Sequence, residues 1–339
     1  MGEFGGNFEG EMKTSEHSTA PEMSQNALET MQNLFKDDRE GEEISPIIID
    51  KSPIDVKDFL SGLFEDDYSD TNEDTDSSDN VNETEKVDFS KQYEPNSKFE
   101  IDGQTYETDD NGYIYKVDGY ELMPDCEYTI GGVTYKTDDQ GRIISCDGNA
   151  TSTPEGERDN KAQTMAGGVD RREGDQGGHI LARIFGGAKG IENMLAMRGS
   201  AINQSVYKRM ENEIAKALEE GKEVHVHVDV EYEGDSQRPS KITVTYTIDG
   251  KETVVQFDND EGSTDLLDSL EDKIDEDEYN DLVQEIEDAN EDGANISVVS
   301  VKTEYDEDGN VTKVTVTIRD ENSDHPVNED RVFSPKEEV

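Results

Sequence analysis

The chain has 339 residues, with 84 Asp and Glu against 31 Lys and Arg, a formal net charge of -53 and 31% hydrophobic residues. Its length allows about two domains of roughly 100–200 residues each. Strong like charge with few apolar side chains excludes one large core, because burial cannot offset the entropy of ordering the whole chain. The two cysteines, Cys126 and Cys146, are too few for a disulfide framework.

Membrane insertion and classical export are not expected. No run of about 18 apolar residues is present, which argues against a membrane-spanning helix. The first ten residues contain no basic region followed by an apolar one, so a Sec-type signal peptide is not expected.

The charge is distributed unevenly. Residues 1–100 carry 27 acids and 8 bases, and residues 259–339 carry 27 acids and 6 bases. Residues 161–222, by contrast, carry ten bases and eight acids. Because net negative charge repels nucleic acid at long range, the slightly basic stretch is expected to bind something different from what its acidic flanks prefer.

Residues 1–92 are predicted to be an acidic, largely disordered tail. Residues 66–85 are almost entirely Asp, Glu, Ser, Thr and Asn, a composition that does not support a packed core. Two short apolar patches, at 27–35 and 47–64, are each interpreted as a transient helix, with a docking motif as the alternative.

Residues 93–149 contain an internal repeat, in which the segment that starts at Pro95 recurs at Pro124. Both copies alternate apolar and polar positions, and both contain a two-residue hairpin turn, Asp102-Gly103 and Gly131-Gly132. Each copy is therefore predicted to be a three-stranded meander. Calcium binding by the Asp-rich turn that follows in each copy is the alternative interpretation, but the glycines that hairpins require already explain these turns.

The rest of the chain is predicted to be α+β. A Gly/Ser/Thr/Glu-rich linker covers 150–170. A helix over about 205–220 is followed by an antiparallel meander with one buried face, and an acidic C-terminal module of helix and hairpin covers 259–339. The expected strands are 223–231, 242–248 and 253–257 in the meander and 296–305 and 311–318 in the hairpin, and the acidic helix is expected over 263–289.

Most of the candidate catalytic and binding residues lie between residues 171 and 222. His179 follows two glycines, which would let another backbone or a phosphate approach closely. In the predicted helix, Glu211 lies at the edge of an apolar arc, and Asn203 comes just before the helix. A structural histidine and an ordinary amphipathic helix are the alternatives. His225 and His227 share the polar face of one strand, for which a solvated face is the default and metal binding the alternative.

Two motifs resemble a known family. Asp175-x-Gly-Gly-His179, then Asn193, and then Asn203-Gln-x-x-Tyr-x-Arg-Met-Glu211 are similar to the DNA/RNA non-specific endonucleases with a ββα-metal (His-Me finger) core. The bacterial branch of this family often occurs as the toxin domain of secreted polymorphic toxins, and the Gly-Lys-x-Val strand at 221–224 resembles that branch. The resemblance covers roughly 122–258, and it implies a ββα-metal nuclease domain over 150–258.

The resemblance also implies roles for individual residues. His179 would be the general base, Asn203 the direct ligand of Mg²⁺, and Glu211 a ligand through water, with Mn²⁺ or Ca²⁺ as substitute metals. A histidine can act as base at neutral pH, and Mg²⁺ needs few protein ligands because it keeps several waters. Gln176 and Gly177 replace the arginine of the family motif. Other cations are therefore expected to bind the substrate phosphate, and the candidates are Arg183, Arg171, Arg172 and Lys208.

The expected partners are DNA, RNA or both, together with an immunity or inhibitor protein, and no membrane. The acidic flanks are expected to bind another protein or the nuclease surface itself, where the acidic helix would compete with substrate. The expected location is the cytoplasm, or outside the cell after signal-peptide-independent secretion. The rival hypothesis is a catalytically weak acidic interaction protein or nucleic-acid mimic built on the nuclease fold. Retention of His179, Asn203 and Glu211 favours the enzyme, whereas the missing arginine and the overall acidity favour the rival.

Overall fold

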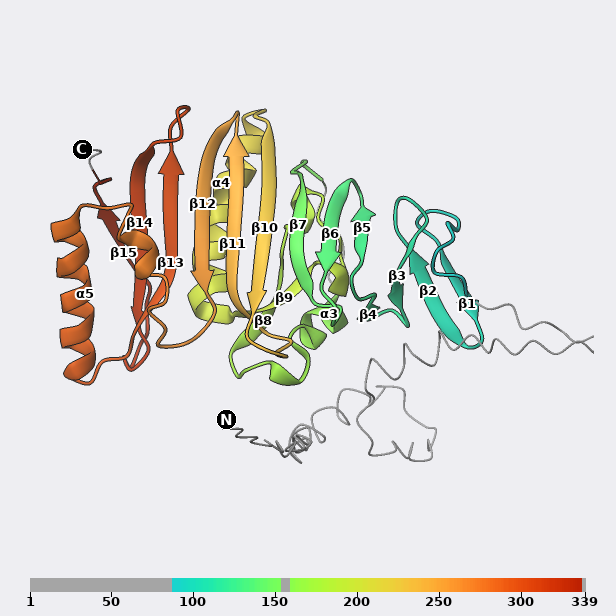
Figure 1. Cartoon of the computed structure of the whole chain (residues 1–339), viewed down its shortest axis with the longest axis horizontal. Coiled ribbons are helices and arrows are strands. Elements are labelled where there is room, and N and C mark those ends of the chain that lie inside the picture. Colours follow the sequence, from blue (N-terminus) through green and yellow to red (C-terminus); the bar gives the residue numbers. More distant parts are fainter. Residues whose placement is uncertain (1–86, 154–158, 337–339) are drawn as a thin grey trace, which may run out of the picture. The chain divides into compact units, whose positions relative to one another are not determined.

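The computed structural model describes residues 87–153 and 159–336, which fold mainly as antiparallel β-sheets with few helices (Figure 1). This α+β class is the one predicted. The predicted tail lies outside the described residues except for 87–92, and so does part of the predicted linker. The boundaries at 92/93, 149/150 and 258/259 stay predictions.

The strands form three sheets. The first has the order β1-β2-β3-β4, the second has nine strands in the order β15-β14-β13-β12-β11-β10-β7-β6-β5, and the third pairs β8 with β9. The bounds are β1 (Lys98–Ile101), β2 (Gln104–Thr108), β3 (Ile114–Val117), β4 (Glu121–Leu122), β5 (Glu127–Ile130), β6 (Val133–Thr137), β7 (Ile143–Asn149), β8 (Asp175–His179), β9 (Met194–Arg198), β10 (Val224–Tyr232), β11 (Pro239–Ile248), β12 (Lys251–Asp258), β13 (Ile296–Tyr305), β14 (Val311–Asp320) and β15 (Glu329–Phe333).

The described residues contain few helices. The α-helices are α3 (Asn160–Met165), α4 (Tyr207–Glu219) and α5 (Glu276–Glu291), and a π-helical segment, η4 (Gly199–Val206), leads directly into α4. Short 3₁₀ turns are η1 (Gly168–Asp170), η2 (Arg183–Phe185), η3 (Ile191–Asn193) and η5 (Asp268–Leu270). None of these helices is long and apolar enough to cross a membrane.

The two copies of the repeat form the predicted meanders but enter different sheets. Asp102, Gly103, Gly131 and Gly132 all have positive φ, as two-residue hairpin turns require. The first copy forms the four-stranded sheet, whereas the second joins the nine-stranded sheet because β7 pairs with β10.

In the Asp-rich turn of the first copy, a carboxylate accepts hydrogen bonds from backbone N–H groups. Asp109 Oδ1 accepts the backbone N–H groups of Asn111 and Tyr113, both at 2.9 Å, and its Oδ2 accepts that of Thr129 at 3.0 Å, which ties the two copies together. Within 87–153 and 159–336, no group of three or more His, Cys, Asp and Glu side chains could hold a metal ion. The Asp109 carboxylate thus serves the turn of the first copy and the contact between the two copies.

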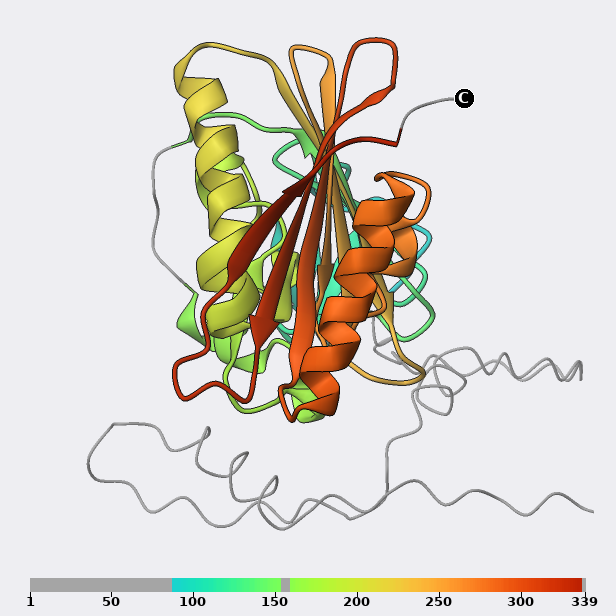
Figure 2. The same cartoon turned by 90° about the vertical axis from the view of Figure 1, so that its left-hand side faces the viewer.

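The two long helices cover opposite faces of the nine-stranded sheet (Figure 2). Helix α4 buries Met210 and Ile214 in a core that also contains the alternating valines of β10 and the inward residues of β11 and β12. Helix α5 instead buries Leu282 and Ile286 against apolar side chains of β13 and β14. The strands β10 to β12 and the strands β13 and β14 are thus each covered by a helix on one face, and the covered face changes between β12 and β13.

The acidic helix is shorter than the sequence predicted. Its apolar residues Leu266, Leu270 and Ile274 are buried, but they lie in a turn, in η5 and in an isolated bridge to Pro335 rather than on a helix that starts at 263. Helix α5 begins only after Asp275, whose side chain accepts the N–H groups of Asp277 and Glu278. A capping carboxylate followed by an acidic first turn favours a helix start at that point, and the apolar periodicity concealed this signal.

Candidate active site

His179 ends the strand β8, and two glycines before it allow close packing on both sides. A Cβ on Gly177 would lie 2.4 Å from the carbonyl oxygen of Gln163 in α3. A Cβ on Gly178 would lie 2.7 Å from Oδ1 of Asn203 in η4. Backbone atoms of Gln163 cannot move aside easily, so glycine is required at position 177, whereas a side chain at position 178 would displace the side chains of Asn203 and Met197. The glycines thus serve the close approach predicted for them, with α3 and Asn203 as the groups that approach.

Segment η4 and helix α4 hold both sides of His179. Asn203 donates from Nδ2 to Oε1 of Gln176 at 2.9 Å, while its Oδ1 lies against Gly178. One helical turn later, the buried Tyr207 donates from Oη to the carbonyl oxygen of Ile180 at 2.5 Å. The residues before and after His179 are therefore fixed by side chains from one continuous helical segment. Sequence reasoning gave Tyr207 no role, although it stands in the helix motif.

Asn193 fixes the loop that follows His179. Its side chain is fully buried, donates to the carbonyl oxygens of Leu181 and Ala188 at 2.8 and 2.7 Å, and accepts the N–H of Leu181 at 3.0 Å. Gly187 lies in this loop, where a Cβ would be only 1.9 Å from the carbonyl oxygen of Leu181. One amide thus satisfies three backbone groups, which holds the chain direction just beyond His179.

Glu211 lies one turn further along α4 than Tyr207, near the edge of the core. Its side chain is 16% exposed and forms an ion pair with Lys208 at 3.0 Å. Burial raises the pKa of Glu211 above its ordinary value of 4.5, while the hydrogen bond and the charge of Lys208 oppose this rise. The carboxylate is thus poised between the core and the solvent, as the sequence pattern suggested.

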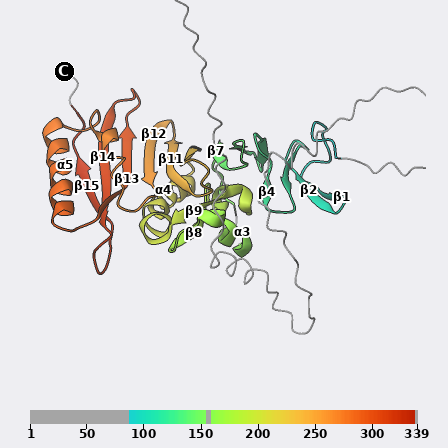
Figure 3. The ribbon, with the colours of Figure 1, turned by 60° about the horizontal axis from the view of Figure 1, so that its bottom comes forward.

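A polar pocket lies beside Asn203. It has a volume of about 430 Å³ and opens between α3, β8 and η4. Figure 3 shows α3, β8, β9 and α4 gathered on one side of the large sheet. The lining residues are Asn160, Gln163, Thr164, Arg171, Gln176, Gly177, Asn203 and Gln204. Amide, hydroxyl and guanidinium groups of this kind suit a ligand that offers hydrogen-bond acceptors.

Residues 124–250 match the family model of the DNA/RNA non-specific endonucleases. This segment is a DNA/RNA non-specific endonuclease domain. The type VII secretion system protein EssD of Staphylococcus aureus strain USA300 is similar to this chain, with 38% identity over 109 residues, and the EssD protein of strain Newman is similar to the same extent. The match covers 30% of this chain and 18% of each relative, so the chain spans much less than two thirds of these proteins.

The endonuclease domain contains all of the proposed site residues and also strands β5 to β7. Its matched range starts at Pro124, where the second repeat begins, and ends at Gly250 in the turn between β11 and β12. Since β7 pairs with β10 from His225↔Asn149 to Asp229↔Ser145, a cut at 149/150 would divide one sheet. We therefore propose that the domain begins near Pro124.

The candidate phosphate-binding cations of the endonuclease domain differ in their contacts. Arg171 donates from Nη1 to three carbonyl oxygens at the end of α3 and from Nη2 to that of Asp175, at 2.6–3.2 Å. Arg172 pairs with Asp260 at 2.5 Å, and Lys208 pairs with Glu211. Arg183 lies half-buried in η2, four residues after His179.

The aspartate of the histidine motif has a structural partner that the sequence did not reveal. Asp175 and Arg238 are both buried, and the guanidinium donates to both carboxylate oxygens, at 2.7 and 3.1 Å. Arg238 also donates to the carbonyl oxygen of Asn259 at 2.6 Å. This pair anchors the start of β8, which carries His179, but no local pattern connects two residues so far apart in the sequence.

Proposed function

We propose that the chain is a metal-dependent, non-specific endonuclease that hydrolyses phosphodiester bonds of DNA and RNA, with His179 as the general base. The observation that carries the proposal is the position of Asn203 Oδ1, which occupies the space that a Cβ on Gly178 would fill, next to His179. A side-chain amide oxygen is a ligand type that Mg²⁺ accepts, and Mg²⁺ keeps most of its waters. These residues therefore fit one weakly held divalent cation, and Mn²⁺ or Ca²⁺ could replace it.

The roles of the other residues follow from their contacts. The imidazole of His179 would take a proton from the attacking water, and Tyr207 and Asn193 would hold the backbone after it in place. Glu211 would orient water bound to the ion held by Asn203. The bound ion would supply Lewis-acid stabilisation of the charge on the phosphate.

The cations that would bind the substrate phosphate are Arg183 and Lys208, as the sequence predicts, together with Arg171 and Arg172. Arg171 and Arg172 remain candidates, but Arg171 would first have to leave the four carbonyl oxygens it contacts, and Arg172 would have to leave Asp260. Contacts to phosphate carry no sequence information, which accords with cleavage of both DNA and RNA.

The similarity to a protein of a type VII secretion system supports a further proposal about biological context. We propose that the chain is exported without a Sec signal peptide, acts as a toxin on nucleic acid, and is held inactive in the producing cell by an immunity or inhibitor protein.

A plasmid-nicking assay tests the proposed function. The full chain should nick supercoiled DNA and degrade RNA with Mg²⁺ and do neither with excess EDTA. Asn203→Ala should require more Mg²⁺ for the same rate, whereas Asn212→Ala, an exposed change on the same helical segment, should not. Absence of any metal-dependent cleavage by the purified chain would reject the proposal.

One observation favours the rival function of an acidic interaction protein. Three arginines of the slightly basic stretch 161–222 are paired with carboxylates from beyond residue 258: Arg172 with Asp260, Arg198 with Glu321 and Arg209 with Asp330. Such pairs leave less positive charge for nucleic acid. Binding of a basic protein partner without any nuclease activity would support this rival.

A further inference from the structure

The segment that presents Asn203 has an unusual backbone. Segment η4 runs from Gly199 to Val206 as a π-helix between β9 and α4. π-Helical segments are rare and occur frequently at functional sites. The side chain of Asn203 is placed by this segment, so contacts that support the segment from outside bear on the position of Asn203.

That support comes from the acidic C-terminal region. Asn328, in the loop between β14 and β15, donates from Nδ2 to the carbonyl oxygen of Ala201 at 2.7 Å and to Oγ of Ser205 at 2.9 Å. These two residues flank Asn203 in the sequence. One amide group thus holds η4 on both sides of the residue that contacts Gly178.

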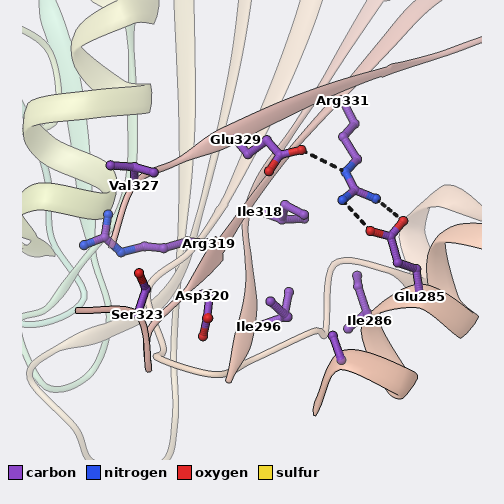
Figure 4. A pocket seen from close by; sticks show the side chains of 11 residues that line it. Glu285, Ile286, Ile296, Ile318, Arg319, Asp320, Ser323, Val327, Glu329 and Arg331 are labelled. Carbon is purple, nitrogen blue, oxygen red and sulfur yellow. Dashed lines mark hydrogen bonds and ion pairs between the residues drawn. The ribbon is translucent and has the colours of Figure 1, made fainter. Parts of the chain in front are cut away.

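A second contact reaches the start of the same segment. Arg319, in β14, donates from Nη2 to Oγ of Ser200 at 3.1 Å and from Nη1 to Oδ1 of Asn328 at 3.2 Å. Figure 4 shows that the guanidinium of Arg319 points away from the ion pair between Glu285 of α5 and Arg331. Arg319 therefore serves the η4 side of β14 and fixes the orientation of the Asn328 amide.

A carboxylate joins these groups to the end of β9. Glu321 accepts from Nε of Arg319 at 3.1 Å and from Oγ of Ser297 at 2.9 Å, and it pairs with Arg198, the residue just before η4. The side chains of Arg198 and Arg319 are 5% and 8% exposed. Buried polar groups that satisfy one another in this way fix a unique arrangement, and removal of one partner is costly.

We propose that Asn328 and Arg319 are positioning residues for the metal-binding side chain of Asn203, and that the acidic C-terminal region is a structural part of the nuclease site. The proposal rests on the proposed function of Asn203. It replaces the expectation that the acidic helix competes with substrate, because α5 covers the face of the sheet opposite to α4.

The test uses Asn328→Ala in the full chain, with two measurements. Amide hydrogen exchange at residues 199–206 should become about tenfold faster, because two hydrogen bonds to this segment are lost. The Mg²⁺ concentration at half-maximal cleavage should rise roughly 10–100-fold, the usual effect of losing a group that orients a ligand. The rate at saturating Mg²⁺ should recover, and Asn328→Gln, which keeps the amide donors, should restore part of both properties.

The matched control is Asn322→Ala. The Asn322 side chain donates to the carbonyl oxygen of Gly293 at 3.0 Å, so it loses a comparable bond in the same region without a contact to η4. If Asn328→Ala does not fold, Ser200→Ala removes the Arg319 contact from the other side and should give smaller changes in the same direction.

The outcomes are separable. Unchanged exchange at 199–206 in Asn328→Ala would overturn the proposed support, and faster exchange with an unchanged Mg²⁺ requirement would overturn the positioning role. If the unmodified chain shows no Mg²⁺-dependent cleavage, the proposed function fails, and the positioning role with it. The exchange measurement then still decides whether Asn328 holds η4.

Discussion

Two neighbouring parts of the nine-stranded sheet, β10 to β12 and β13 to β15, use their faces in opposite ways. Across β10 to β12, the face under α4 carries the core and the segments that place His179 and Asn203, while the other face is solvated and bears His225 and His227. Across β13 to β15, the face under α5 is apolar, and the opposite face contacts η4 and α4 through polar groups such as Lys302, which pairs with Glu213 at 2.6 Å. The first part thus carries the site, and the second part supports it from the side.

The largest expected effect comes from removing the proposed base on the covered face. His179→Ala should lower cleavage by at least about 10²–10⁴-fold, the range for a general acid–base group, with an unchanged unfolding temperature. His225→Ala, on the solvated face of β10 and 44% exposed, is the matched control and should cleave normally. Plasmid nicking and thermal unfolding measure both. Normal cleavage by His179→Ala would contradict the assignment of the active site to the face of the sheet under α4.

The second largest effect is expected from breaking the ion pair between Asp175 and Arg238, which anchors the strand that carries His179. Arg238→Met would leave the buried carboxylate of Asp175 unpaired and should lower the free energy of unfolding by about 3–5 kcal/mol. The exposed cross-strand pair of Lys136 and Glu127 is the control, and Lys136→Met should change this free energy by less than about 1 kcal/mol. Equal urea midpoints for the two variants would contradict this assignment.

The contrast between the two helices can be sharpened with buried truncations. Leu282 of α5 and Ile214 of α4 are each 2% exposed, so Leu282→Ala and Ile214→Ala should each lower the free energy of unfolding by roughly 2–5 kcal/mol. Cleavage per folded molecule should fall only in Ile214→Ala, because α4 carries Glu211 and continues from η4. A comparable fall in Leu282→Ala would mean that α5 acts on the site.

The smallest expected effect on stability comes from Glu211→Gln. Because burial raises the pKa of Glu211, the folded state holds this proton more tightly than the unfolded state does. The protonated carboxyl group contributes its full stabilisation at pH values below 4.5, the ordinary pKa. This contribution is lost as the pH rises through the pKa of Glu211 in the folded state, which is higher. Glutamine mimics the protonated form, so the variant should lack this loss and be slightly more stable at neutral pH.

Glu211→Gln should at the same time cleave roughly 10–100-fold more slowly, as expected for a group that orients bound water. Urea unfolding from pH 4 to 8 and the nicking assay measure the two properties. If the variant is less stable than the original chain at neutral pH, burial of the charged carboxylate does not destabilise the folded state.

Local signals in the sequence predicted the parts of the fold that depend on local chemistry. The turns at Asp102-Gly103 and Gly131-Gly132 set the two meanders, and the apolar period of Met210 and Ile214 located α4. The missed elements depend on distant partners. Among the described strands, β15 lies at the edge of the sheet and pairs with β14 alone, and the π-helical form of η4 coincides with the contacts of Asn328.

The candidate site likewise combines residues that local motifs identify with contacts that form only in the folded chain. His179, Asn203 and Glu211 could be named from their motifs, and the pair of glycines signalled a close approach. What the glycines approach could not be read from the sequence, because no pattern links Gly177 to α3, and η4 reaches Gly178 only after β9 turns the chain back. The partnership of Asp175 with Arg238 likewise arises only when the loop before β11 folds against the start of β8.

The pairing of β7 with β10 has a consequence for how the chain folds. Every residue from α3 to the end of α4 lies in the excursion between these two adjacent strands, and their register, from His225↔Asn149 to Asp229↔Ser145, closes that excursion. Local hairpins form in microseconds, whereas contacts distant in sequence require the entropy of a long loop to be overcome first. We expect the meanders to acquire protection early in a refolding reaction and nuclease activity to return last. A newly made chain would then pass through an inactive period whose length is set by sheet closure.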